Sequence, residues 1–232
     1  MNQEAGFSIA TYTGSTASGA LTVGHGLGKK PAVVIVKKRD GTGDWVVGHQ
    51  GLATNAFANS KFLKLDVNNG VFTNSLVWGA EPTTTVTQIV SNGAAGASNL
   101  TSSGTYVMYS WTEIPGYSKF GSFQGNGNAN GPFVFTGFRP AMIFYKRVDA
   151  SDNWGIHDNK RDVDNPIQRF LYPDDTYAEW TGGTNDHVDF LSNGFKIRNS
   201  GSMFNQNNHT IVYWAFAETS HNSPNGGQSR AR

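Results

Sequence analysis

The sequence predicts an all-β protein built from two tandem, internally duplicated antiparallel β-sandwich halves of jelly-roll-like type. Short apolar segments alternate with Asn-Gly and Asp-Gly turns, and almost no segment has the apolar spacing of a helix. The stretch from Pro31 to Trp45 recurs without a gap from Pro140 to Trp154. Net charge is only +1, so the chain lacks the high charge that keeps a weakly apolar chain disordered.

The expected strands follow in chain order. In the first half they cover residues 7–12, 21–23, 32–39, 44–47, 61–65, 84–90 and 106–112. In the second half they cover residues 122–123, 133–135, 141–148, 154–157, 169–172, 187–191, 194–198 and 210–217. Four of these segments are apolar on both faces and are expected to be central strands: 32–36, 106–112, 141–145 and 210–217. We therefore expect sandwich repeats at 1–114 and 119–218, followed by a tail at 219–232.

The repeat also predicts the roles of particular side chains. Matched order makes Trp45 the counterpart of Trp154, and Trp78 the counterpart of Trp180, all expected in the core. The basic pairs Lys37-Lys38 and Lys146-Arg147 also recur. We expect them to end a buried strand and to stack on the following Trp, with contact to an anionic glycan or an acidic partner as the alternative.

Residues with recognisable catalytic or metal-binding spacing are missing. There is no cysteine, the six histidines show no ligand spacing, and no Gly-x-Ser-x-Gly elbow is present. The glycine-rich loop at 24–30 has Lys30 where a phosphate-binding loop needs Ser or Thr. Acidic residues gather at Asp162, Asp164, Asp174 and Asp175 and could supply calcium ligands, but they have no calcium-loop spacing, and residues 174–175 have no matching acids in the first half. We therefore expect no catalytic residue, no metal site, no cofactor and no enzyme activity.

Partner contacts are expected on loops that the repeat does not share. The aromatic candidates are Phe57, Tyr172, Tyr177, Phe195 and Phe204. The polar tail ends in Arg230 and Arg232 and is expected to be ordered by a neighbouring subunit, which predicts a homo-oligomer. The small net charge gives no field for nucleic acid, and neither a signal peptide nor a membrane-inserting segment is recognisable.

The residues Gly26-Leu27-Gly28, Pro31-Ala32, the basic pair and the closing Trp45 form one pattern, which ends in the second half with Tyr213-Trp214-Ala215-Phe216-Ala217-Glu218. This pattern resembles a repeat module of tail-fibre and other virion proteins of aquatic tailed bacteriophages, notably those of cyanobacteria. The resemblance covers about residues 7–113 and 119–218.

The resemblance implies a non-enzymatic virion structural protein of the tail-fibre or adhesion type, which mediates host attachment. Its expected partners are other copies, other virion proteins or a host surface glycan, and no catalytic residue carries over. Because the module makes up nearly the whole chain, a capsid decoration or tail accessory protein is one alternative. A carbohydrate-binding lectin or a polysaccharide-degrading enzyme is another, based on the aromatic residues and the acidic loops.

Overall fold

The structure is a computed structural model that describes residues 1–14, 19–91, 104–181, 183 and 187–218. It is nearly all β, with 42% strand and 3% helix, so the expected all-β sandwich class is confirmed. The chain divides into two compact units, Met1–Glu113 and Ile114–Arg232, hereafter unit 1 and unit 2. The expected tail at 219–232, including Arg230 and Arg232, lies outside the described residues.

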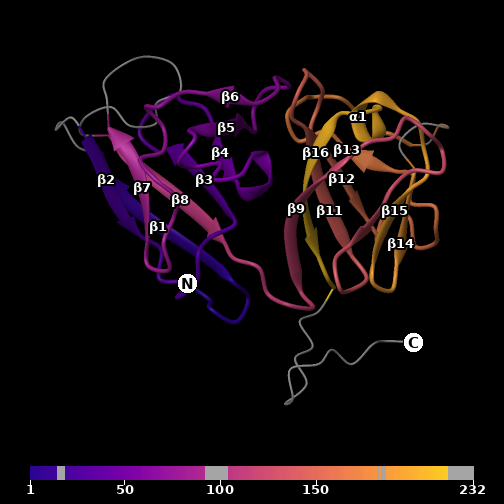
Figure 1. Ribbon diagram of the computed structural model, residues 1–232, viewed down its shortest axis with the longest axis horizontal. Coiled ribbons are helices and arrows are strands. Elements are labelled where there is room, and N and C mark those ends of the chain that lie inside the picture. Colours follow the sequence, from indigo (N-terminus) through magenta and orange to yellow (C-terminus); the bar gives the residue numbers. More distant parts are fainter. Residues whose placement is uncertain (15–18, 92–103, 182, 184–186, 219–232) are drawn as a thin grey trace. The chain divides into compact units, whose positions relative to one another are not determined.

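Unit 1 contains a six-stranded antiparallel sheet in the order β1-β8-β3-β4-β5-β6 and a separate β2-β7 pair (Figure 1). The strands are β1 (Phe7–Thr13), β2 (Gly19–Gly24), β3 (Val33–Lys38), β4 (Val46–His49), β5 (Lys61–Lys64), β6 (Phe72–Thr73), β7 (Val86–Ser91) and β8 (Thr105–Trp111). A 3-10 turn, η1 (Gln50–Leu52), follows β4.

Unit 2 contains a five-stranded antiparallel sheet in the order β13-β12-β11-β16-β9 and a three-stranded sheet in the order β10-β15-β14. The strands are β9 (Ser118–Gln124), β10 (Phe133–Phe135), β11 (Met142–Arg147), β12 (Gly155–Asp158), β13 (Phe170–Leu171), β14 (Val188–Leu191), β15 (Gly194–Ile197) and β16 (Thr210–Phe216). One short helix, α1 (Ser202–Asn205), precedes β16.

Each unit buries one core between its two sheets. In unit 1, Val23 of β2 and Ile89 of β7 belong to the same buried cluster as Val34 of β3. In unit 2, Phe195 of β15 shares a cluster with Tyr145 of β11. This burial between sheets is the defining packing of a β-sandwich. The four doubly apolar segments form β3, β8, β11 and β16, each with a strand on both sides, as the sequence predicts.

The large sheets of the two units share strand order and register. Omitting β6, the order β1-β8-β3-β4-β5 in unit 1 corresponds to β9-β16-β11-β12-β13 in unit 2. Val34 lies opposite Ser110, and its sequence counterpart Ile143 lies opposite Ala215, the counterpart of Ser110. Because a slip of one residue would exchange the two faces of a strand, this common register preserves which side chains face each core.

The smaller sheets differ between the units. In unit 1, β7 pairs directly with β2. In unit 2, the corresponding strand β14 turns after Leu191 and pairs with β15, and β15 then pairs with β10. The turn at Ser192-Asn193 therefore adds a strand between the elements that are direct neighbours in unit 1.

Two of the expected core tryptophans are not core residues. Trp154 and Trp78 are 0% and 2% exposed, but Trp45 is only half-buried and Trp180 is 37% exposed. Trp154 packs on Phe144 and Trp214, with ring centroids 5.1 and 5.3 Å away. In unit 1 the counterparts of these two side chains are smaller, namely Ile35 and Tyr109, so they cover less of Trp45.

Trp180 is exposed because its neighbours differ from those of Trp78. Trp180 bridges to Phe170 in β13, whereas Trp78 bridges to Ile89 in β7 and donates from its indole nitrogen to the Lys61 carbonyl at 3.1 Å. Trp78 and Trp180 were paired in the sequence comparison, but they bridge to strands that are not equivalent, so that pairing is wrong.

Candidate aromatic binding surface

An exposed group of aromatic rings lies beside β13 in unit 2. We call Tyr172, Tyr177 and Trp180 the aromatic surface. Tyr177 is 65% exposed, Trp180 is 37% exposed and Tyr172 is half-buried. These three side chains come from the nine-residue stretch Tyr172–Trp180, a loop that follows β13 and ends at the isolated bridge between Trp180 and Phe170. Surface rings of this kind often mark a contact site for a ligand or partner.

Buried packing under the surface holds the rings in place. Phe170, which is 0% exposed, lies 4.8 Å from Tyr172 and 6.1 Å from Trp180 between ring centroids. Tyr172 in turn contacts Tyr177 edge-on at 5.5 Å. The Trp180 nitrogen donates to the Phe170 carbonyl at 3.0 Å, and the Phe170 nitrogen donates back at 3.3 Å. The surface is therefore anchored to the sheet through both side chains and main chain.

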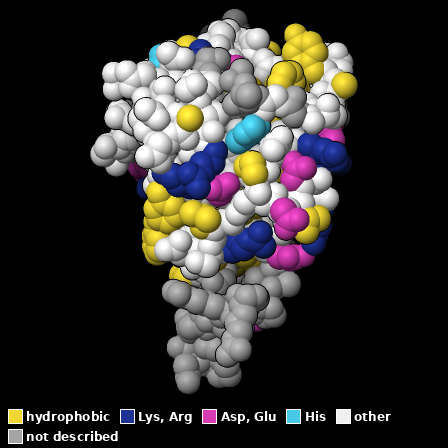
Figure 2. Space-filling view, turned by 90° about the vertical axis from the view of Figure 1, so that its right-hand side faces the viewer, with side chains coloured by type: hydrophobic (Ala, Val, Ile, Leu, Met, Phe, Trp, Pro, Cys, Tyr) yellow, Lys and Arg dark blue, Asp and Glu magenta, His cyan; other side chains and the backbone are white. Residues whose placement is uncertain are grey.

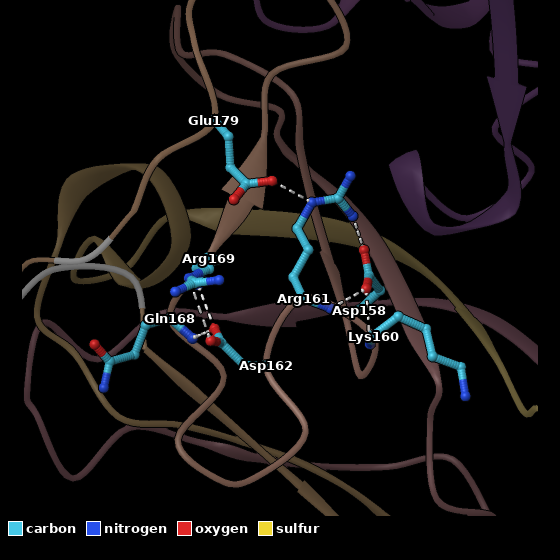
Figure 3. A network of polar contacts seen from close by, with 7 residues as sticks. All are labelled: Asp158, Lys160, Arg161, Asp162, Gln168, Arg169 and Glu179. Atoms are coloured by element: carbon cyan, nitrogen blue, oxygen red, sulfur yellow. Dashed lines mark hydrogen bonds and ion pairs between the residues drawn. The ribbon is translucent and has the colours of Figure 1, made fainter.

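A network of ion pairs braces the loop beside Trp180 (Figure 3). Arg161 pairs with Glu179 at 2.8 Å and with Asp158. The Asp158 carboxylate also accepts the main-chain N–H groups of Lys160 and Arg161, both at 2.9 Å. Because Glu179 directly precedes Trp180, the network holds the main chain next to the indole in position.

A second carboxylate in Figure 3, that of Asp162, stabilises the loop between β12 and β13. Asp162 accepts the main-chain N–H groups of Gln168 and Arg169 at 2.7 and 2.6 Å. The Arg169 side chain lies 3.6 Å from the other oxygen of that carboxylate. Asp162 was a possible cation ligand in the sequence, but its oxygens serve as acceptors for the protein's own donors.

The remaining acidic residues near the surface leave it with a negative bias. Asp174 accepts the Trp154 main-chain N–H at 3.0 Å, and burial raises the pKa of its carboxyl above the ordinary value. Asp175 is exposed and accepts the Thr176 N–H at 2.7 Å. Within the stretch 172–180 there are three acidic residues and no basic one. Arg161 is shared between Glu179 and Asp158, and the buried Lys146 acts on Asp174, so the exposed Asp175 is the carboxylate of this stretch that would repel a bound anion.

Asp174 has a structural counterpart that the sequence comparison missed. In unit 1, Asp66 accepts the Trp45 main-chain N–H at 3.1 Å, as Asp174 does for Trp154. Both carboxylates follow equivalent strands at the same spacing, three residues after the matched Leu63 and Leu171, so the match was already present in the sequence. Each unit therefore has a carboxylate that accepts the main-chain N–H of the Trp directly before β4 or β12.

Three of the five expected contact residues are core residues instead. Phe57, Phe195 and Phe204 are each 0% exposed, which corrects their assignment to a partner surface. Phe195 alternates inward on β15, and Phe204 is carried inward by α1, where its ring lies 4.0 Å from that of Tyr145. Phe57 packs edge-on against Trp78 at 5.2 Å. Only Tyr172 and Tyr177 lie together at the surface, and Trp180 joins them.

In the described part of the chain, no group of three or more His, Asp or Glu side chains is arranged to hold a metal ion. None of the helices described there is long and apolar enough to cross a membrane.

Comparison with known proteins identifies one family. Neither the curated proteins nor the solved structures contain a significant match to this chain. The match that exists is to a family described as "Domain of unknown function (DUF7483)", and it extends over residues 1–220. Since that range includes both units through the end of β16, the chain belongs to the DUF7483 family.

Proposed function

We propose that this protein is a non-enzymatic bacteriophage virion protein of the tail-fibre or adhesion type, which attaches the particle to its host through the aromatic surface of unit 2. The observation that carries the proposal is the exposure of Tyr177 and Trp180 above the buried ring of Phe170. A loop that is anchored to a sheet and exposes aromatic rings to solvent suits a ligand that offers flat apolar faces and hydroxyl groups. Saccharides have this chemistry.

The charge around the surface narrows the saccharide class. Asp175 and Glu179 offer oxygen acceptors beside the rings, and Arg161 is already paired with Glu179. Hydroxyl or ammonium groups would donate to these carboxylates, whereas a uronate or sulfate would face repulsion. The proposed ligand is therefore a neutral or amino-bearing surface glycan, rather than an acidic one.

The same proposal includes an internal duplication. The common strand order and common register of the two large sheets support descent of both units from one ancestral sandwich. After duplication, only unit 2 has the loop that presents Tyr172, Tyr177 and Trp180. Unit 1 stacks Trp45 on Tyr109 at 6.3 Å, and both rings are half-buried. Ligand binding is thus assigned to unit 2.

A binding experiment tests the ligand class. The purified chain is screened against a printed array of neutral, amino-bearing and acidic bacterial saccharides, and the strongest ligand is then titrated in solution by calorimetry. We expect binding to neutral or amino-bearing saccharides, with Trp180→Ala weakening the affinity at least about thirtyfold, as for a central aromatic contact. Tyr177→Phe keeps the ring and is expected to retain most of the affinity, whereas Tyr177→Ala loses it.

The matched control is Val163→Ala, which shortens a 73%-exposed side chain of unit 2 outside the aromatic surface. Its affinity is expected to equal that of the unaltered protein. Binding only to acidic saccharides, or equal affinity in the Trp180→Ala and Val163→Ala variants, would refute the assignment of this surface. Release of reducing ends from the bound saccharide over time would instead support a polysaccharide-degrading enzyme.

A further inference from the structure

A second exposed apolar group lies on the outer face of the three-stranded sheet of unit 2. Phe133 and Phe135, at the two ends of β10, are 45% and 63% exposed, while Val134 between them faces the core at 7%. Figure 2 views unit 2 from the side that carries β14 and β15, and it shows hydrophobic side chains gathered next to basic and acidic ones. Two large exposed rings on one short strand are unusual unless something covers them.

β10 is also the end strand of its sheet. Its partner is β15, and in the described part of the chain no strand pairs with its other edge. The Ile197 nitrogen donates to the Pro132 carbonyl at 3.1 Å, and the Thr136 nitrogen donates to the Asn193 carbonyl at 3.0 Å. Since main-chain groups alternate in direction along a strand, those of Phe133 and Phe135 point away from β15. The open edge therefore presents the N–H and C=O groups of both phenylalanines.

Charges that usually protect an open edge are absent from β10, whose sequence is Phe-Val-Phe. The nearest charges on the same face are satisfied within the sheet. Lys196 donates to the Gly131 carbonyl at 2.6 Å, and Asp189 pairs with Arg198. Asp189 is neutralised by Arg198, and the Lys196 ammonium is held at the Gly131 carbonyl, so β10 itself brings no charge to its open edge and is complementary to an apolar, uncharged strand.

β10 of another copy is itself an apolar, uncharged strand. We propose that β10 pairs antiparallel with β10 of a second copy of this chain about a two-fold axis, with Phe133 opposite Phe135 of the second copy. In this register the outward main-chain groups of the two phenylalanines exchange hydrogen bonds, and the same contact is repeated by symmetry. Each Phe133 ring would then lie beside the Phe135 ring of the second copy. Lys196 lies on the β15 side of Phe133, away from the second copy.

The pairing has a consequence for attachment. A dimer carries two aromatic surfaces, one in each chain, so each chain's weak contact with a saccharide would be reinforced by the other. The dimer stands on the geometry of β10 alone, and its test uses no saccharide.

The oligomeric state tests the proposal directly. Sedimentation equilibrium of the full chain is expected to show a reversible dimer at concentrations up to about 1 mM. Phe135→Glu leaves Phe133 over Gly194 but places a charge against the second copy, so we expect dimerisation to weaken at least a hundredfold. The control Tyr177→Glu adds the same charge at a residue of similar exposure and should dimerise normally. A monomer across the whole range, or equal dimerisation of the two variants, would overturn the proposal.

Cross-linking tests the register and remains informative if Phe135→Glu misfolds. The chain has no native cysteine, so Phe133→Cys and Phe135→Cys can be made separately and then mixed. Directly opposed residues lie about 5.5 Å apart between Cα atoms, within disulfide reach, whereas diagonal ones lie about 7–8 Å apart. We expect the mixture to form disulfide dimers much faster than either variant alone. Equal rates, or dimers of one variant alone, would contradict the proposed pairing.

Discussion

The recurring basic pair occupies different environments in the two units. Lys37 lies 5.5 Å from the centre of the Trp45 ring, which confirms the expected cation–π contact in unit 1. Its counterpart Lys146 is 0% exposed and donates to the Arg147 carbonyl at 2.6 Å. Burial lowers the pKa of the Lys146 ammonium to about 8, although Asp152 and Asp174 act in the opposite direction. The repeated sequence therefore predicts the position of this lysine but not its burial.

The pKa of Lys146 predicts how stability depends on pH. The folded pKa lies below the ordinary value of 10.5, so the folded state releases this proton first as pH rises. The cost of burying the charge is present below about pH 8 and is relieved above it, which raises the free energy of unfolding. We expect a gain of about 2 kcal/mol between pH 7 and 9.5, measured by urea unfolding. The Lys146→Met variant should show no such gain, and an equal gain in that variant would contradict the prediction.

The paired tryptophans should differ in their contributions to stability. Trp154 is fully buried, so Trp154→Ala should lower the free energy of unfolding by about 3–5 kcal/mol. Trp45 is half-buried, and Trp45→Ala should cost roughly half as much because less apolar area is lost. Urea unfolding of each variant measures both values. A larger cost for Trp45→Ala would show that the difference in burial is not the controlling factor.

At the scale of elements, apolar patterning predicted the strands well and the faces of the loops poorly. The continuous apolar runs identified β3, β8, β11 and β16 as central strands. Phe204 was misplaced because polar residues flank the short Met203-Phe204 pair, and the turn of α1 carries both side chains into the core. Trp180 was misplaced in the opposite sense, since its environment depends on pairing with Phe170 across a loop. Local sequence carries no information on such contacts.

The loop after β9 depends on one buried amide. The Asn205 side chain, 0% exposed, donates to the carbonyls of Asn128 and Asn199 at 2.8 and 2.6 Å and accepts the Asn126 N–H at 2.8 Å. Asn205→Ala would leave these groups unpaired, so it should destabilise unit 2 by about 3 kcal/mol or more. Hydrogen exchange should show lost protection at the Asn126 amide. Unchanged exchange there would mean that the loop does not depend on this side chain.

At the scale of the whole molecule, two sandwiches of common register differ most in what their loops present. Both units keep the carboxylate that caps the Trp main-chain N–H, Asp66 in one and Asp174 in the other. Among the residues that the structure describes, an exposed tyrosine and tryptophan lie beside acidic acceptors in unit 2 and not in unit 1. The recurring sequence predicted the common strand order because matched residues pack alike, whereas the exposed Tyr177 has no matched counterpart in the first half and leaves no such signal.

The most direct test of host attachment is competition for adsorption. Host bacteria are incubated with increasing amounts of the purified chain before virions are added, and unadsorbed particles are counted. The account predicts that the unaltered protein and Val163→Ala block adsorption alike, while the double variant Tyr177→Ala, Trp180→Ala does not. Adsorption that is blocked equally by the double variant, or that is unaffected by the unaltered protein at saturating concentration, would contradict it.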